Sequence, residues 1–151
     1  MKISNELVKS LSFFEQFDDR LISLIQPYFE FVSFKPGDVI LEQNDFNTKL
    51  YYLMEGLLDI YIDDQFIVSI SQEGEIFGEM SIAGHTTTTA KVMTKTNSSI
   101  VIFDFTEIQN IQGHERCMIE KLIYKSCAEV LARRLLATNE IAKTYRNINK
   151  K

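Results

Sequence analysis

Tryptophan is absent from the 151-residue sequence, and cysteine, histidine and proline occur only twice each. Two thiols are too few for an iron–sulfur cluster, which needs four. Cys117 and Cys127 stand ten positions apart in a predicted helix, and a rigid helix keeps them too far apart to form a disulfide. His114 and Cys117 have a spacing that suits a metal, but no second pair of ligands accompanies them. We therefore expect neither a disulfide framework nor a metal site.

Signatures of catalysis are also absent. Neither histidine lies in a recognisable nucleophile motif, and the sequence has no carboxylate pair and no phosphate-loop lysine signature. We therefore expect that the protein is not an enzyme.

The sequence has no long apolar run. No stretch approaches the length of a membrane span, and the N-terminus lacks the charged and apolar regions of a secretory signal. The composition, with 45% hydrophobic and 25% charged residues, is typical of one globular domain with a sizeable core. We therefore expect a single soluble domain over 1–151, located in a reducing cytoplasm and without a membrane partner.

The net charge of −5 is unevenly distributed. Residues 1–114 contain 7 Lys or Arg against 17 Asp or Glu, a charge of −10, whereas residues 115–151 contain 9 against 4, a charge of +5. The acidic residues 1–114 should repel nucleic acid. The basic residues of 115–151 are explained more simply as the solvated face of a long helix. The charge pattern therefore does not favour DNA binding.

Two short helices are predicted before residue 28. Ser4-Asn5 is a plausible cap for a helix over 6–11, and a second helix follows Asp18-Asp19 until Pro27 stops it. From Phe29 the apolar residues fall into short runs separated by turn signals such as Glu55-Gly56, Asp63-Asp64 and Glu73-Gly74. Seven or eight strands without intervening helices predict an antiparallel sandwich or barrel. The runs are 29–34, 39–41, 50–54, 57–62, 66–70, 90–94 and 99–103, with a further strand end expected near Phe77.

The pattern becomes helical again after Asp104. A short segment over 105–111 leads to a long helix from Glu115 to about Ile148, which neither proline nor glycine interrupts. Seven residues of this helix are spaced alternately four and three apart, the heptad pattern of a helix that pairs with a second copy. They are Tyr124, Ala128, Leu131, Leu135, Thr138, Ala142 and Tyr145, and we call them the heptad seam. A second apolar set, which we expect to pack on the strands, is Ile119, Ile123, Val130 and Ile141.

The stretch 72–92 has the features of a sugar-phosphate site. Gly78 lets the backbone approach a ligand closely, and Glu79 offers an acceptor pair that suits a hydroxyl. The following residues predict one short helix whose free N–H groups face an anion.

This stretch resembles the phosphate-binding cassette of the cyclic-nucleotide-binding domain family. The resemblance rests on Gly78-Glu79, Ala90-Lys91-Val92 and Lys95-Thr96, and it extends to Lys35–Ile40 and Tyr51–Gly56, which stand in the family's order and spacing. It implies a mainly β fold: a jelly-roll-like antiparallel β-roll over 29–104 with its cassette at 74–92, preceded by helices at 1–28 and followed by a C-terminal dimerisation helix within 105–151. It also implies a regulatory module that signals through this helix, without a DNA-binding domain, as a homodimer or with another protein partner.

The resemblance also implies a set of ligand-binding residues for cyclic AMP, cyclic GMP or a related phosphorylated ligand. Glu79 would accept the ribose 2′-hydroxyl, and nearby amides would bind the phosphate. Thr88 occupies the position of the family's phosphate-binding arginine, so two hypotheses remain open: a ligand-binding pocket, or a degenerate pocket in a constitutive dimerisation or interaction module. Thr138 and Asn139 match a pair that contacts the base, the second from the partner subunit, but they are equally explained as polar interruptions that fix the register of a dimer seam. The full predicted set is Phe77, Gly78, Glu79, Met80, Ser81, Thr88, Thr89, Ala90, Thr138 and Asn139.

Overall fold

The N-terminal segment folds as two capped helices, as the sequence predicts. The computed structural model describes residues 2–71 and 74–150. Helix α1 (Asn5–Ser10) begins after Ser4, whose hydroxyl accepts a hydrogen bond from the Leu7 amide, and α2 (Asp19–Ile25) begins after Asp18, whose carboxylate accepts one from the Leu21 amide. Each cap satisfies a backbone donor that the first turn of a helix leaves free. Short 3₁₀ helices follow them, η1 (Ser12–Phe14) and η2 (Gln26–Tyr28).

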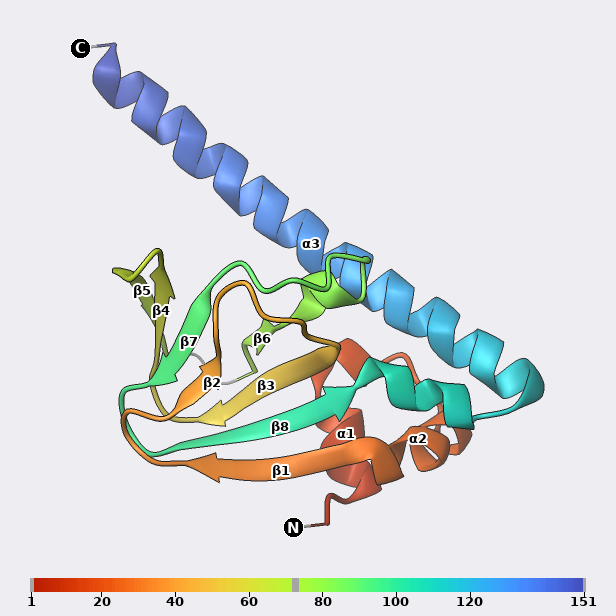
Figure 1. The fold of residues 1–151 in the computed structure, drawn as a ribbon. Helices are drawn as coiled ribbons and strands as arrows, with labels where there is room; N and C mark the ends of the chain where they lie inside the picture. Colours follow the sequence, from red (N-terminus) through yellow and green to blue (C-terminus); the bar gives the residue numbers. More distant parts are fainter. Residues whose placement is uncertain (1, 72–73, 151) are drawn as a thin grey trace.

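The centre of the chain forms two four-stranded antiparallel sheets that together make the β-roll (Figure 1). One sheet has the order β1-β8-β3-β6 and the other the order β2-β7-β4-β5. The predicted jelly-roll-like fold class is therefore confirmed. The strands are β1 (Phe29–Phe34), β2 (Val39–Leu41), β3 (Lys49–Glu55), β4 (Leu58–Ile62), β5 (Gln65–Ile70), β6 (Ile76–Phe77), β7 (Lys91–Thr94) and β8 (Ser98–Asp104).

The turns between the strands have the backbone that their residues favour. Asp63 and Asp64 both adopt positive φ, as a two-residue hairpin turn between β4 and β5 requires. Gly74 also has positive φ, whereas Gln72 and Glu73 lie outside the described residues, so the predicted Glu73-Gly74 turn is described only at its glycine.

Two apolar clusters use opposite faces of the first sheet. Leu53, Leu58 and Ile100 are fully buried inside the β-roll, between the two sheets. On the other face, Phe14 and Phe103 belong to a larger cluster beneath the helices, where their rings meet edge to face. Because β3 and β8 are covered on both faces, they form a rigid base, and β6, from which the chain continues into the candidate site, pairs with β3.

The C-terminal helix α3 (Gly113–Asn149) follows a 3₁₀ segment, η4 (Phe105–Asn110), and runs well beyond the β-roll (Figure 1). Its first half buries Ile119, Ile123 and Val130 against the core, as predicted. The same prediction is wrong for Ile141, which is 70% exposed, because α3 has already left the β-roll at that point.

Within residues 2–71 and 74–150, no helix is long and apolar enough to cross a membrane, and no three His, Cys, Asp or Glu side chains gather as a metal site would require. Cys117 is exposed and Cys127 is buried, and both are free thiols.

Candidate functional site

Eight of the ten predicted ligand-binding residues surround one cavity of about 570 Å³. They come from β6, from the turn that follows it and from the threonine loop 86–89 with Ala90. The cavity opens between this segment, the inner face of the second sheet and α3. Its other wall residues include Leu41, Ile60, Val68, Ile70 and Val92 from the sheet and Leu131 and Arg134 from α3.

The backbone at position 78, beside the cavity, requires a glycine. Its φ of 85° lies in the left-handed region that glycine favours, and a Cβ at this position would lie 2.4 Å from the Lys49 carbonyl oxygen. Asn47 maintains this approach, because its side-chain amide donates to the Lys49 carbonyl at 2.9 Å and accepts from the Lys49 amide at 3.1 Å. The close approach turns the chain so that Glu79 faces the cavity.

The predicted short helix after Gly78 is a single 3₁₀ turn, η3 (Glu79–Ser81). The Ser81 hydroxyl donates to the Gly78 carbonyl at 2.7 Å, and the Ile82 amide donates to the Glu79 carbonyl at 3.1 Å. These bonds fix the turn on which Glu79 stands.

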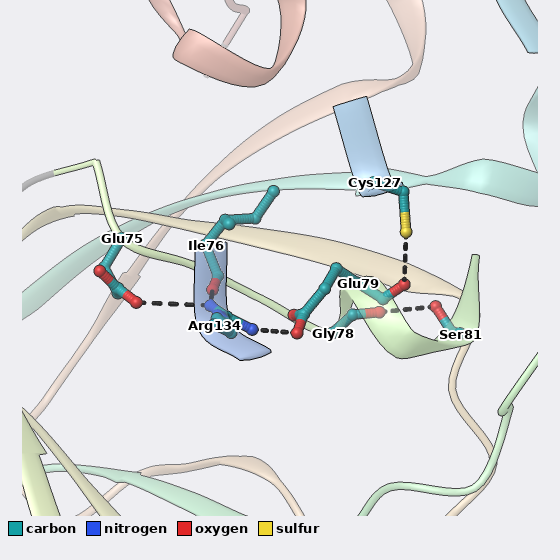
Figure 2. Close-up of polar contacts among 7 residues, drawn as sticks. All are labelled: Glu75, Ile76, Gly78, Glu79, Ser81, Cys127 and Arg134. Atoms are coloured by element: carbon teal, nitrogen blue, oxygen red, sulfur yellow. Dashed lines mark hydrogen bonds and ion pairs between the residues drawn. The ribbon is translucent and has the colours of Figure 1, made fainter. Parts of the chain in front are cut away.

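Glu79 is buried and is held by α3 at two points (Figure 2). Its carboxylate pairs with a guanidinium nitrogen of Arg134, and its backbone carbonyl accepts a hydrogen bond from the Cys127 thiol at 3.4 Å. The second guanidinium nitrogen of Arg134 donates to the Ile76 carbonyl and lies 3.3 Å from the Glu75 carboxylate. The side chain of Glu79 is only 5% exposed, so Arg134 supplies the partner that a buried carboxylate requires.

Burial, followed by the negative charge of Glu79, raises the pKa of the Cys127 thiol. The thiol therefore stays protonated at neutral pH and remains a hydrogen-bond donor. Cys127 and Arg134 stand seven positions apart, which places them on the same side of α3.

Thr88 is engaged with the loop between β2 and β3. Its hydroxyl donates to the Glu42 carbonyl and accepts from the Asp45 amide at 2.9 Å, while its own amide donates to the Asp45 carbonyl at 2.8 Å. The position that the resemblance assigns to a phosphate-binding arginine thus holds a neutral side chain, which bonds to this loop.

Thr138 and Asn139 do not line the cavity in the described part of the chain, and both are exposed. The Thr138 hydroxyl donates to the Arg134 carbonyl at 2.9 Å, one turn earlier in α3.

The residues of the heptad seam have different surroundings. Leu131 is half-buried, packs against the core and lines the cavity, whereas Leu135 and Tyr145 are exposed. Tyr124 is half-exposed, and its ring meets the Phe105 ring edge to face, with 5.7 Å between the ring centroids. The seam residues from Leu135 to Tyr145, which we call the outer part of the seam, are exposed within one chain. They are therefore available for contact with a second copy.

Sequence reasoning missed Arg134 and Asn47. The signal for Arg134 was its place on the roll-facing side of the helix, seven positions after Cys127, where a charged residue needs a buried partner. Asn47 gave no signal, because its role depends on a backbone approach between segments distant in sequence.

Comparison with known proteins identifies the family. Residues 31–114, more than half of the chain, match the family model described as cyclic nucleotide-binding domain. The cyclic GMP-binding protein C of Dictyostelium discoideum is 31% identical over 109 residues, which are 69% of this chain and 4% of that protein. The cGMP-dependent protein kinase of Plasmodium berghei is 29% identical over 79 residues, 52% of this chain and 9% of the kinase. The chain thus spans a small part of these relatives.

Solved structures share the fold. A putative cyclic nucleotide-binding protein from Geobacter metallireducens has a TM-score of 0.75 and 22% identity, covering 88% of this chain and 98% of that one. The catabolite activator protein of Thermus thermophilus has a TM-score of 0.67 and 19% identity, covering 89% and 62%. The family match, which covers the sheets and the cassette with Gly78 and Glu79, shows that this chain belongs to the cyclic nucleotide-binding domain family of regulatory modules.

Proposed function

We propose that the chain binds a cyclic nucleotide in the 570 Å³ cavity and transmits its presence through α3. The observation that carries this proposal is the attachment of Glu79 to α3 through both Arg134 and Cys127. Glu79 offers the carboxylate that would accept a ribose hydroxyl, and the threonine loop would face the phosphate. A ligand that contacts Glu79 therefore changes the contacts of α3.

The cost of burying the Glu79 carboxylate without a donor explains why α3 would respond to a ligand. Glu79 needs a donor because it is buried, and in the free protein that donor is Arg134. A ligand hydroxyl would provide another donor, which changes the relative stability of two positions of the helix. A ligand shifts such an equilibrium only by its differential affinity for the two states, and a contact that competes with Arg134 provides that difference.

The names of two relatives make cyclic GMP the first ligand to test, since they describe a cyclic GMP-binding protein and a cGMP-dependent kinase. Calorimetric titration of the chain with cyclic GMP, cyclic AMP and inorganic phosphate tests the proposal. We expect saturable heat with at least one cyclic nucleotide and none with phosphate. Flat traces with both nucleotides would contradict it.

We further propose that two copies pair in parallel through the outer part of the heptad seam. Leu135 and Tyr145 are exposed apolar side chains on this seam, with no partner in the described chain. Arg134 directly precedes the seam residue Leu135, and Asn139 directly follows the seam residue Thr138. These are the two flanking positions that meet across a parallel helix pair, so Asn139 of the partner subunit would lie beside Arg134 and the cavity.

A second candidate function is a constitutive dimerisation module with a degenerate pocket. The side chain of Thr88 favours this alternative, because it is neutral and its hydroxyl is already bonded to the loop between β2 and β3, which leaves no charge at that position for a phosphate. The titration described above separates the two functions.

A further inference from the structure

The charge of the cavity identifies an additional role for one residue, and this inference rests on the proposed binding of a cyclic nucleotide. Among the described residues that line the cavity, the carboxylates are Glu75 and Glu79, and the guanidinium of Arg134 is the one permanent cation. The two carboxylates outnumber this one guanidinium, and their excess negative charge opposes the entry of a phosphate diester. An anionic ligand therefore needs Arg134.

The geometry of Arg134 suits this task. Its side chain is 39% exposed, lies at the wall of the cavity and is turned toward Glu75 on one side and Glu79 on the other (Figure 2). A guanidinium has five N–H donors in a fixed fork, so it can contact a phosphate while keeping a bond to the Ile76 carbonyl. Thr88 has no charge, and its hydroxyl already bonds to the loop between β2 and β3.

We propose that Arg134, from α3, is the counter-charge for the ligand's phosphate and takes the role that the Thr88 position cannot fill. On binding, the guanidinium turns from Glu79 toward the phosphate, and a hydroxyl of the ligand donates to Glu79 in its place. Each buried charge keeps a partner throughout, which avoids the penalty of an unpaired charge in the cavity. Arg134 is thereby a specificity-determining residue that couples the ligand's negative charge to α3.

The test compares an anionic ligand with a neutral one. Cyclic GMP carries the phosphate, whereas guanosine has the same base and sugar without it. We expect Arg134→Gln to weaken cyclic GMP binding by tenfold or more and to change guanosine binding by less than about threefold, since a charge-assisted bidentate contact is lost only for the anion. The matched control is Arg133→Gln, which removes the same charge from the adjacent position of α3, outside the cavity, and should leave both affinities unchanged.

Two further variants make the test independent of folding defects. Arg134→Lys keeps a positive charge beside Glu79, and because one ammonium cannot contact two anions as a fork does, it should reduce cyclic GMP affinity several-fold and spare guanosine. Adding Thr88→Arg to Arg134→Gln should restore cyclic GMP binding, because the charge returns from the other side of the cavity.

Three outcomes would overturn the inference. Equal cyclic GMP binding by the wild type and Arg134→Gln shows that the arginine is not the counter-charge, and equal losses for cyclic GMP and guanosine show a purely structural role. In both cases the proposed function survives. A wild type that binds no cyclic nucleotide removes the proposed function and this inference together.

Discussion

The two halves of α3 carry the same apolar repeat in opposite surroundings. Ile123 and Ile141 are separated by eighteen positions (141 minus 123), about five turns of helix, and so are Val130 and Ile148, so each pair points to the same side. Ile123 is 0% exposed and Ile141 is 70% exposed, and Val130 is 6% exposed against 64% for Ile148. The helix is the same, and what differs is whether the β-roll lies beneath it.

The boundary between the halves coincides with the candidate site. Arg134 is the last residue of α3 that contacts the β-roll through a described ion pair or hydrogen bond, and its partners are Glu79, Glu75 and the Ile76 carbonyl. Every described residue from Leu135 onward is exposed. A ligand that alters the Glu79 contact therefore acts where the helix changes from a buried element to a free one.

The largest expected effect is a loss of stability from the buried half of α3. Ile123→Ala should reduce the free energy of unfolding by about 2–5 kcal/mol, because it leaves a cavity in the core. Ile141→Ala, its matched control five turns later, should change that free energy by less than about 0.5 kcal/mol. Urea unfolding at low protein concentration measures both. A large loss of unfolding free energy for Ile141→Ala would mean that the half of α3 after Arg134 is packed in solution.

The next prediction concerns the turn at Gly78, which places Glu79 against the buried half of α3. Gly78→Ala should cost about 2–4 kcal/mol, because it adds a Cβ clash with the Lys49 carbonyl to the strain of positive φ. Gly74→Ala has nearly the same φ with nothing within 4 Å of the added Cβ, so it should cost only about 1 kcal/mol. Thermal unfolding of the two variants measures the difference, and similar costs would show that close approach at Gly78 is unimportant.

A third prediction concerns the exposed half of α3. Leu135→Glu with Tyr145→Glu should weaken dimerisation about a hundredfold, because charges would then face an apolar partner stripe. Leu136→Glu is the control, since Leu136 is equally exposed but lies outside the heptad seam. Light scattering over a concentration series gives the dissociation constants. Dimers that persist in the double variant would contradict the proposed pairing.

The fourth effect, which is the smallest at neutral pH, develops at alkaline pH and tests the interior of the β-roll. Burial, followed by the charge of Asp104, raises the pKa of Tyr51 to about 12 from its usual 10. The folded state therefore retains a proton that the unfolded chain loses above pH 10. Stability should fall as the pH rises from 10 to 12, by up to about 3 kcal/mol.

Tyr51→Phe should remove the part of this dependence that Tyr51 contributes, and a smaller dependence should remain because burial also raises the pKa values of Tyr52 and Cys127. The Tyr51 hydroxyl contacts Asn47 only weakly, at 3.4 Å, so the loss at neutral pH should stay below about 1 kcal/mol. Denaturant unfolding at pH 7 and pH 11 measures both effects, and an unchanged slope in the variant would assign the alkaline loss to another group.

Much of the fold was predictable from local signals. The caps at Ser4 and Asp18, the strand runs and the turns at Asp63-Asp64 and Gly74 depend on neighbouring residues, and the structure places these elements within a residue or two of the expected bounds. The side chains that complete the site were harder to predict from the sequence, because the pairing of Arg134 with Glu79 joins positions 55 residues apart.

Local properties of the sequence, namely backbone preference and apolar period, set the order of helices and strands, the glycine beside the cavity and the carboxylate after it. The tertiary structure alone decided which half of the repeating helix is buried, where Leu131 and Ile141 point relative to the core, and that the cation of the cavity comes from α3. These features depend on the extent of the β-roll under the helix and on desolvation of Glu79 between distant segments, and neither quantity is encoded in any single stretch of residues.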